Sequence, residues 1–492
     1  MNSLTVLMVS GDSAVFDPKS TVSERVRSYA KHTGRLDVII PTATFLSREE
    51  KTIHVHSAYH RLKVLRFWRL VTVGERLPRP DIITAQDPFF LGLAAWFIAR
   101  HHHTPLEIQV HTDVLDPVFR TWSVGNRARV LLARLLLPQA QSVRVVSERI
   151  ANSLVHSGIL SRTQISVLPI PPMEHKPSAE SIRSLRARFS PHDCLVLTVS
   201  RLAPEKRVDL MLEALALIYH RGFSFQFIIV GDGEERRSLE RCAQRLGIFD
   251  RVHFVGHVLD PSPYYHVAHV YLSLSVYEGY GLSLVEAARA KLPVISTDVG
   301  IAPLVGASLV APNSALIAEL IIRKDLPPTS LPADFIQSED EYMQAVFHVW
   351  SRCAHGAVSP RRKTSYLWLI VKYVISGGTA TIVNLGLIFV FTDFFQMWYV
   401  LSAALAYAGA FVISFTLQKF WTFQNTSVEK IHSQFAVYVG LGIFNMVLNA
   451  GLIYLIVEST GIHYLLAQIG IGIFIACWSF FFYRVLFRKT TS

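Results

Sequence analysis

Short apolar runs alternate with amphipathic segments along the first 354 residues of the chain. TVLMVSG at 5–11 and CLVLTVS at 194–200 are such runs, and each is followed by residues with helical spacing. Strands that are apolar on both faces and alternate with helices are typical of parallel sheets covered by helices. We therefore predict an α/β fold. ISVLPIPP at 165–172 runs into a Pro-rich hinge, which separates residues 1–172 from residues 173–354.

Four long apolar runs follow residue 365. They cover about 367–391, 399–417, 435–457 and 464–487, and each is near the roughly 20 residues that span a bilayer. A pair of buried helices in a soluble protein is a poor alternative at these lengths. We predict a linker at 355–365 and a membrane domain of four transmembrane helices over 366–489.

Lysine and arginine are unevenly distributed around these four runs. They fall at the amino-terminal end, in the middle loop and at the carboxyl end, whereas the other two loops contain none: Arg361, Arg362, Lys363, Lys372, Lys419, Lys430, Arg484, Arg488 and Lys489. Cytoplasmic loops carry an excess of Lys and Arg. We therefore predict a multi-pass protein whose first 365 residues, middle loop and carboxyl terminus are cytoplasmic.

The membrane segment also repeats itself with a shift of 65 residues. Tyr373, Gly377 and Asn384 recur as Tyr438, Gly442 and Asn449, and NLGLIFV matches NAGLIYL. Two hairpins of equal orientation are predicted, as in the parallel repeats of small transporters. The two asparagines are polar within apolar helices, so they either join helices to one another or line a substrate path.

Composition narrows the functional classes. The chain has 492 residues, a formal net charge of +11 and four cysteines without metal-site spacing. The positive charge suits an anionic ligand or a membrane surface and does not by itself require nucleic acid. Scattered cysteines indicate free thiols in a reducing compartment. The amino terminus lacks a basic n-region, so it indicates a first strand rather than a signal peptide.

Two basic stretches, His60–Leu70 and Asn126–Leu137, alternate Arg or Lys with large apolar residues. They are either surface helices whose Arg stems cover apolar surface or segments that dock on an anionic bilayer. The run His101–His103 lacks nearby acidic or Cys partners, so a metal site there is disfavoured.

The stretch from Ser275 to Gly300 carries the strongest chemical signal. Glu278 lies between two apolar runs that read as buried strands, and Glu286 lies on the helix between those runs. Open α/β sheets bind ligands at the carboxyl ends of their strands. Two carboxylates there, beside Gly279 and Gly281, predict a site for a hydroxyl-rich ligand. For Glu286, Ser283-x-x-Glu286 also spells a capping box, in which the glutamate only satisfies a helix end.

Three further residues follow predicted strands. Arg201 and Lys206 lie in a turn before a helix, where cations and free helix amides form an anion site that suits a diphosphate. Surface charge without a partner is the alternative. His111 directly follows LEIQV and is predicted to face an inter-domain cleft, unless it is a hydrogen-bonded structural histidine.

The loop SGDSAV around Gly11 lacks the GxGxxG spacing of a dinucleotide fold, which disfavours a nicotinamide enzyme.

These motifs resemble glycosyltransferase family 4, the retaining sugar-nucleotide-dependent enzymes of the GT-B fold. The resemblance rests on SRLAPEK, VGDGEE, FVGHV and YEGYGLSLVEAARAKLPVISTDVG, with DIITAQDPFFLG and VHTD in the amino-terminal half, and covers roughly residues 1–350. It implies two Rossmann-like domains, with the acceptor side on residues 1–172 and the nucleotide-sugar donor side on residues 173–354. The last helix of that second range could pack back on the first domain.

The same resemblance assigns roles by position. Arg201 and Lys206 would hold the donor diphosphate, and Glu286 the ribose hydroxyls. Glu278 and His111 would be catalytic and face the donor sugar from opposite domains. Gly11, Gly279 and Gly281 would be loop glycines near the donor.

The sequence lacks a DxD motif, so we predict no metal and no cofactor beyond the nucleotide diphosphate sugar that serves as substrate. Cations and helix amides must then stabilise the leaving diphosphate. Two stretches depart from the family pattern: Ile170-Pro171-Pro172 replaces a frequent Asn-Gly, and IAPLVG follows Gly300. The contacts to the donor sugar at these two positions are therefore expected to differ from the family pattern.

The membrane segment resembles the GtrA-like family, four-helix proteins associated with polyprenyl-phosphate-linked sugars. KYVISGGTATIVN and SFTLQKFWTF carry the resemblance, with Gln418 where Asn is usual. Together the two resemblances imply a membrane-anchored retaining glycosyltransferase of cell-surface polysaccharide synthesis. Its partners would be a nucleotide-sugar donor, a lipid-linked or glycan acceptor and membrane lipids, but not nucleic acid. A non-enzymatic carrier of lipid-linked sugar, with a degenerate transferase part, is the alternative.

Overall fold

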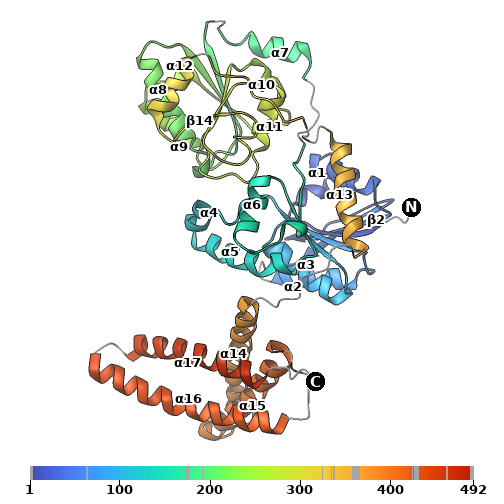
Figure 1. Cartoon of the computed structure of the whole chain (residues 1–492), viewed down its shortest axis with the longest axis vertical. Coiled ribbons are helices and arrows are strands. Elements are labelled where there is room, and N and C mark those ends of the chain that lie inside the picture. The colour runs from blue at the N-terminus through green and yellow to red at the C-terminus, as the bar shows by residue number, and fades with distance from the viewer. Residues whose placement is uncertain are drawn as a thin grey trace. The chain divides into compact units, whose positions relative to one another are not determined.

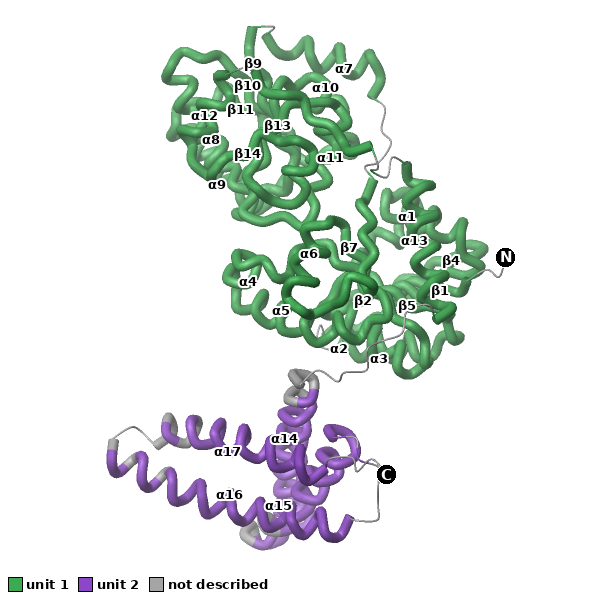
Figure 2. The backbone as a smooth tube through the Cα atoms, in the orientation of Figure 1, with its two compact units in different colours: residues 1–361 green, residues 362–492 purple. Residues whose placement is uncertain are grey.

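The computed structural model describes residues 4–62, 65–171, 177–190, 192–323, 325–333, 335, 338–356, 366–423, 425, 431–460 and 464–487. The chain divides into two compact units, residues 1–361 and residues 362–492, which Figure 2 draws in different colours. The first unit is built on two sheets and the second is helical (Figure 1).

Within the described residues, the first sheet has eight strands in the order β3-β4-β2-β1-β5-β6-β7-β8. β3 is antiparallel to β4, and all other neighbours are parallel. The strands are β1 Thr5–Val9, β2 Arg35–Thr42, β3 Ser47–Glu50, β4 Ile53–Tyr59, β5 Ile82–Ala85, β6 Leu106–Val110, β7 Ser142–Val145 and β8 Ile165–Val167. The helices between them are α1 Thr21–Lys31, α2 Leu65–Arg76, α3 Phe90–His102, α4 Pro117–Trp122, α5 Val124–Leu136 and α6 Glu148–His156.

The second sheet, over the part of the chain described, has six parallel strands in the order β11-β10-β9-β12-β13-β14. They are β9 Cys194–Val199, β10 Phe225–Val230, β11 Val252–Gly256, β12 Val270–Ser273, β13 Val294–Ser296 and β14 Ser308–Leu309. The helices are α7 Ala179–Arg186, α8 Val208–His220, α9 Arg236–Arg245, α10 Ser262–Val267, α11 Leu282–Arg289 and α12 Ser314–Arg323. Central strands apolar on both faces need helices on both sides, which explains the α/β pattern of the sequence.

Helix α13, Glu339–Ala354, follows the second sheet in sequence but packs into the core of the first. Its buried face joins β1, β2 and α1 in one apolar cluster through Tyr342, Met343, Val346, Trp350 and Cys353. Figure 1 shows α13 beside α1. The chain therefore returns to the first sheet before it enters the linker.

The second unit contains, among its described residues, helices α14 Tyr366–Phe389, α15 Tyr399–Thr416, α16 Ile431–Thr460 and α17 Tyr464–Leu486. Aromatic side chains from α15, α16 and α17 form a buried cluster around Phe415, Tyr438 and Tyr483. Two described stretches, Lys372–Phe394 and Ile431–Ile456, are long and apolar enough to cross a membrane, and Gly470–Leu486 is a shorter apolar helix. The unit is thus a bundle with the composition of a membrane domain.

The packing of α13 predicts a stability effect. Met343 is 2% exposed in the core of the first sheet, so we expect Met343→Ala to lower the free energy of unfolding by about 2–5 kcal/mol. The exposed neighbour Gln344 provides the control, because Gln344→Ala changes a surface position and should cost no more than about 0.5 kcal/mol. Denaturant unfolding of both variants, followed by tryptophan fluorescence, measures the difference. Equal midpoints would contradict the packing.

Candidate active site

The carboxyl ends of β9 and β12 bring a cation and a carboxylate together. Lys206 ends the short 3-10 turn Pro204–Lys206 that precedes α8, and Glu278 lies in the loop between β12 and α11. Lys206 Nζ donates to Glu278 Oε1, and Ser275 Oγ donates to the same oxygen over 3.1 Å. Each side chain of this pair is 18% exposed. A lysine ammonium has three N–H donors, so Lys206 can hold an anion while it contacts Glu278.

Arg201 occupies the same loop but reaches solvent. Its side chain is 70% exposed, and its Nη2 donates to Glu205 Oε1 over 2.6 Å. Glu205 is buried, and its carbonyl accepts from the amide of Val276 over 2.8 Å. This bond joins the loop after β9 to the loop after β12. The two predicted cations therefore have different surroundings: Lys206 contacts the Glu278 carboxylate, and Arg201 lies at the open, solvent-exposed side.

Glu286 lies within α11, and the capping-box alternative for it is wrong. The helix begins at Leu282, with Gly281 as its N-cap and no side-chain capping bond, so Ser283 is already inside the helix. The Glu286 Oε2 atom instead accepts a hydrogen bond from Tyr265 Oη over 2.7 Å. Tyr265 is buried, and burial raises the pKa of its hydroxyl well above the ordinary value. Tyr265 therefore acts as a donor that orients the Glu286 carboxylate.

Gly279 brings the loop after β12 against the loop after β6. A Cβ at residue 279 would lie 1.8 Å from the carbonyl oxygen of His111 and 2.5 Å from the Cα of Thr112. Such distances exclude any side chain. Gly281 has φ of 88°, a left-handed conformation that favours glycine, at the start of α11. The two predicted glycines therefore have distinct structural reasons.

Aromatic residues of the same loop contact the first sheet's segments. The Tyr277 ring packs edge-on against Phe119 and Trp122 of α4, at centroid distances of 5.7 and 5.9 Å. Tyr280 Oη donates to the carbonyl of Ile170 over 2.8 Å. These contacts, with Gly279, join the loop that carries Glu278 to the loop that carries His111.

His111 directly follows β6 at this meeting point. Residue 111 keeps solvent-exposed surface, but its ring lies against the protein, where Nε2–H donates to Gln109 Oε1 over 3.2 Å in a partly buried hydrogen bond. Surrounding protein desolvates the ring, and with the nearby cations Arg144 and Arg25 this lowers the pKa of His111 to about 4. The imidazole is therefore neutral near pH 7, and it can accept a hydrogen bond at Nδ1.

Gly11 lies in the loop after β1, which leads away from the same carboxyl edge of the first sheet. Its neighbour Ser10 donates from Oγ to Gln86 Oε1, after β5, over 2.7 Å. A Cβ at residue 11 would meet only Leu91 at 3.5 Å, an ordinary contact. Packing thus does not require glycine there, and a role for Gly11 near the donor stays a prediction.

Three further candidate residues of this site were not predicted from the sequence: Tyr265, Glu205 and Gln109. Nothing in the sequence around Tyr265 links it to Glu286, because the contact joins two helices. Gln109 had a detectable signal, since Glu107, Gln109 and His111 alternate with apolar residues and so share one face of β6.

The histidine run at the end of α3 has structural roles. His102 Nε2 donates to the carbonyl of Gly74 over 3.0 Å, and His103 caps the helix in a left-handed conformation with φ of 52°. Among the described residues there is no group of three or more His, Cys, Asp or Glu that could hold a metal ion.

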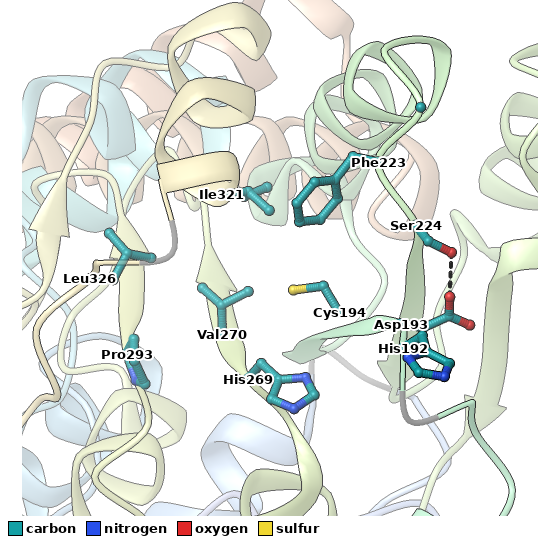
Figure 3. Close-up of a pocket in the computed structure, with 11 residues that line it drawn as sticks. His192, Asp193, Cys194, Phe223, Ser224, His269, Val270, Pro293, Ile321 and Leu326 are labelled. Atoms are coloured by element: carbon teal, nitrogen blue, oxygen red, sulfur yellow. Dashed lines mark hydrogen bonds between the residues drawn. The ribbon is translucent and has the colours of Figure 1, made fainter.

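A cavity of about 620 Å³ lies at the opposite edge of the second sheet. Figure 3 shows its lining, which includes Cys194, Val270 and Pro293 at the amino ends of β9, β12 and β13, with the His269 ring below them. Asp193 at its rim accepts hydrogen bonds from Ser224 and Gln226. Lys206 and Glu278 lie at the carboxyl ends of these strands, so this cavity is not part of the candidate active site.

Three family models match successive parts of the chain. Residues 21–171 match the glycosyl transferase 4-like domain, residues 193–323 match glycosyl transferases group 1, and residues 372–487 match the GtrA/DPMS transmembrane domain. The matched ranges cover the first sheet from α1 to β8, the whole second sheet, and most of the helical unit.

Individual proteins resemble parts of the chain. It is 26% identical over 270 residues to alpha-monoglucosyldiacylglycerol synthase of Streptococcus pneumoniae, covering 52% of this chain and 58% of that protein. It is 29% identical over 174 residues to the phosphatidylinositol N-acetylglucosaminyltransferase gpi3 subunit of Schizosaccharomyces pombe, covering 35% and 37%. The chain thus spans less than two thirds of either relative.

A solved structure has the same fold. The crystal structure of Anabaena Alr3699/HepE in complex with UDP and glucose matches 76% of this chain and 99% of its own, with a TM-score of 0.52 and 20% identity. Together with the two sheets, which are parallel apart from β3, this likeness confirms the predicted GT-B fold.

The lowered pKa of His111 predicts a pH effect on stability. An unfolded histidine binds a proton near pH 6.5, whereas folded His111 binds one near pH 4, so stability is lost as the pH falls through this window. We expect the melting temperature of the wild-type chain to fall more between pH 7 and 5 than that of His111→Gln. Because residue 111 is exposed to solvent, screening keeps the effect small.

Differential scanning fluorimetry of the full chain in detergent measures these slopes. His257→Gln, at an exposed position on the second sheet's side, is the control and should retain the wild-type slope. Parallel curves for wild type and His111→Gln would contradict the prediction.

Proposed function

We propose that this chain, which belongs to the group 1, family 4-like glycosyltransferases and carries a GtrA/DPMS transmembrane domain, transfers a sugar from a nucleotide diphosphate to a lipid-linked or glycan acceptor. The observation that carries the proposal is the Lys206–Glu278 pair at the strand ends, closed on the His111 loop by Gly279. A cation, a carboxylate and a neutral imidazole at one edge suit a donor that has both a diphosphate and a hydroxyl-rich sugar.

The donor's charge distribution fits the two sides of this site. Lys206 and the amide groups at the start of α8 would bind the diphosphate, with Arg201 at the open side. Glu278 accepts only on Oε1 among the described residues, which leaves Oε2 for a sugar hydroxyl. Glu286, oriented by Tyr265, would accept from the ribose hydroxyls.

The proposed reaction retains the configuration of the sugar. The bond between the sugar's anomeric carbon and the diphosphate oxygen breaks, and the acceptor hydroxyl oxygen attacks the same face. The acceptor's proton passes to the departing phosphate oxygen, so no separate base is needed. Lys206, Arg201 and the α8 amides stabilise the charge that develops on the leaving group.

The helical unit would hold the protein at the membrane, with residues 1–361 on the cytoplasmic side where nucleotide sugars are made. Its interior supports a second role, in product handling. A cavity of about 520 Å³ between the helices is lined by amides and hydroxyls together with apolar groups, including Thr381, Asn384, Ser414, Asn445 and Asn449. The buried Oδ1 atoms of Asn384 and Asn445 have no partner among the described residues. We propose that this cavity accepts the neutral, hydroxyl-rich head group of a lipid-linked sugar.

The rival function is a non-enzymatic carrier of lipid-linked sugar, favoured by the departures at Ile170-Pro171-Pro172 and after Gly300. Residue 172 lies outside the described residues. The amide of Ile301 bonds to the carbonyl of Tyr280 over 3.0 Å, so the IAPLVG segment supports the loop that carries Glu278. An assay of nucleotide diphosphate release distinguishes the transferase from the carrier.

The catalytic proposal predicts a loss of transfer in two variants. We expect Lys206→Ala and Glu278→Gln each to lower the turnover number by about 10²–10³-fold, since each removes a preorganised group beside the reacting atoms. The assay incubates the purified full chain with a panel of nucleotide sugars and polyprenyl phosphate, and measures released nucleotide diphosphate.

Arg237→Ala is the matched control, because Arg237 is an exposed cation on helix α9, between β10 and β11 of the second sheet. It should retain wild-type release. If no donor releases nucleotide with the wild-type chain, the carrier function is favoured.

The cavity in the helical unit predicts weaker binding when its acceptors are removed. Asn384→Leu and Asn445→Leu should each weaken the binding of a short-chain polyprenyl-phosphate hexose by about tenfold, the effect of one hydrogen bond. Binding is measured by microscale thermophoresis in nanodiscs. Leu385→Ala, at a side chain that is 62% exposed on the surface of α14, should leave affinity unchanged, and equal losses in all three variants would contradict a specific site.

A further inference from the structure

A chain of buried polar side chains crosses one face of the first sheet and ends at His111. Glu107 and Gln109 of β6 share that face with Thr84 of β5 and Arg144 of β7, and in the sheet register Thr84 pairs with Glu107 and Gln109 with Arg144. All four residues are at most 4% exposed. Burying polar groups is costly unless their hydrogen bonds are satisfied, so their alignment requires an explanation.

The hydrogen bonds in this chain have a defined direction. Glu107 is ion-paired with Arg144, whose Nε donates to Glu107 Oε1 over 2.9 Å, so Glu107 is an anion and can only accept. The hydroxyl of Thr84 therefore donates to Glu107 Oε2, over 2.5 Å. Its lone pair accepts from Gln109 Nε2 over 2.9 Å, and this orients the Gln109 carbonyl oxygen toward His111.

The last link determines the tautomer of His111. Gln109 Oε1 is an acceptor only, so the His111 Nε2 atom that faces it at 3.2 Å must carry the hydrogen. In a neutral imidazole, Nδ1 is then the acceptor. Resting on the function proposed above, we infer that Gln109, Thr84 and Glu107 are positioning residues that hold His111 as the Nε2–H tautomer, with Nδ1 ready to accept a hydrogen bond from a hydroxyl of the donor sugar.

Helix α13 supplies the other end of the chain. Trp350 Nε1 donates to Glu107 Oε2 over 2.9 Å, and Arg144 Nη1 donates to Tyr342 Oη over 2.7 Å. These two residues lie on the helix that immediately precedes the linker to the helical unit. Helix α13 therefore contacts the Glu107 and Arg144 side chains at which this chain of hydrogen bonds begins.

A structural role alone would not require this direction. Buried ion pairs contribute little net stability compared with apolar packing of the same volume, and Arg144 keeps one buried nitrogen, Nη2, without a partner among the described residues. A carboxylate, a hydroxyl and an amide placed in this order transmit the acceptor character of Glu107 to the ring three side chains away.

The decisive variant is Thr84→Val, which keeps the shape of the side chain but removes the hydroxyl. Gln109 Nε2 then loses its acceptor, the amide can rotate, and His111 loses its tautomer preference. We expect the turnover number to fall about tenfold, as for other groups that orient a functional residue, with little change in KM for the nucleotide sugar. Thr84→Ser retains the hydroxyl and should restore wild-type turnover.

A second readout is independent of activity. Nitrogen NMR of the full chain with ¹⁵N-labelled histidine, with the His111 signals assigned by their loss in His111→Gln, reports which ring nitrogen carries the proton. Wild type and Thr84→Ser should show the Nε2–H form, and Thr84→Val a mixture of both tautomers. If Thr84→Val does not fold, Gln109→Met removes the same link and should give the same mixture.

The outcomes separate this inference from the proposed function. An unchanged Nε2–H signal in the folded Thr84→Val or Gln109→Met chain overturns the inference, whatever the activity. A tautomer mixture with wild-type turnover shows that the network acts on His111 but that the Nδ1 contact to the donor is wrong. A chain without transferase activity, with the tautomer shift present, contradicts the proposed function alone.

Discussion

The close approach of Gly279 to the backbone of His111 is the contact on which the candidate site depends. It joins the loop after β12 of the second sheet to the loop after β6 of the first, at a distance that excludes every side chain. Glu278 and His111 are neighbours of this contact, so their separation is determined by backbone rather than by flexible side chains. The Tyr277 and Tyr280 contacts reinforce it from the same loop. A residue larger than glycine would push the two functional side chains apart.

Charge in the site is arranged around this contact. The Lys206–Glu278 pair combines a cation for the anionic part of a donor with a carboxylate for its hydroxyls, and Glu205 holds Arg201 at the open side. His111 contributes a neutral ring, because protein around it and the cations Arg144 and Arg25 lower its pKa. The site therefore combines positive charge at Lys206 and Arg201 with the acceptors Glu278 and His111, a distribution that suits the proposed sugar-nucleotide donor.

Helix α13 connects the candidate site to the core of the first sheet. It packs in the core of the first sheet, contributes Trp350 and Tyr342 to the buried polar chain that ends at His111, and immediately precedes the linker. The helical unit has a separate cavity lined in part by Asn384 and Asn445, whose buried Oδ1 atoms have no partner among the described residues. This lining supports the proposal that the cavity accepts the hydroxyl groups of a sugar.

The amino-acid pattern by itself determined the α/β fold, the apolar helical segment and the strand ends where the site residues lie, because these follow from local periodicity and from residues next to each apolar run. Tertiary structure decided which residues the site side chains contact. The sequence could not distinguish a capping role for Glu286 from a ligand role, since that depends on where α11 begins and on Tyr265 from another helix. Likewise the sequence could not show that Lys206 contacts Glu278 whereas Arg201 is exposed to solvent. Nor could it connect Glu107 through Thr84 to His111. Contacts between residues on different strands depend on sheet order and register, which local sequence does not encode.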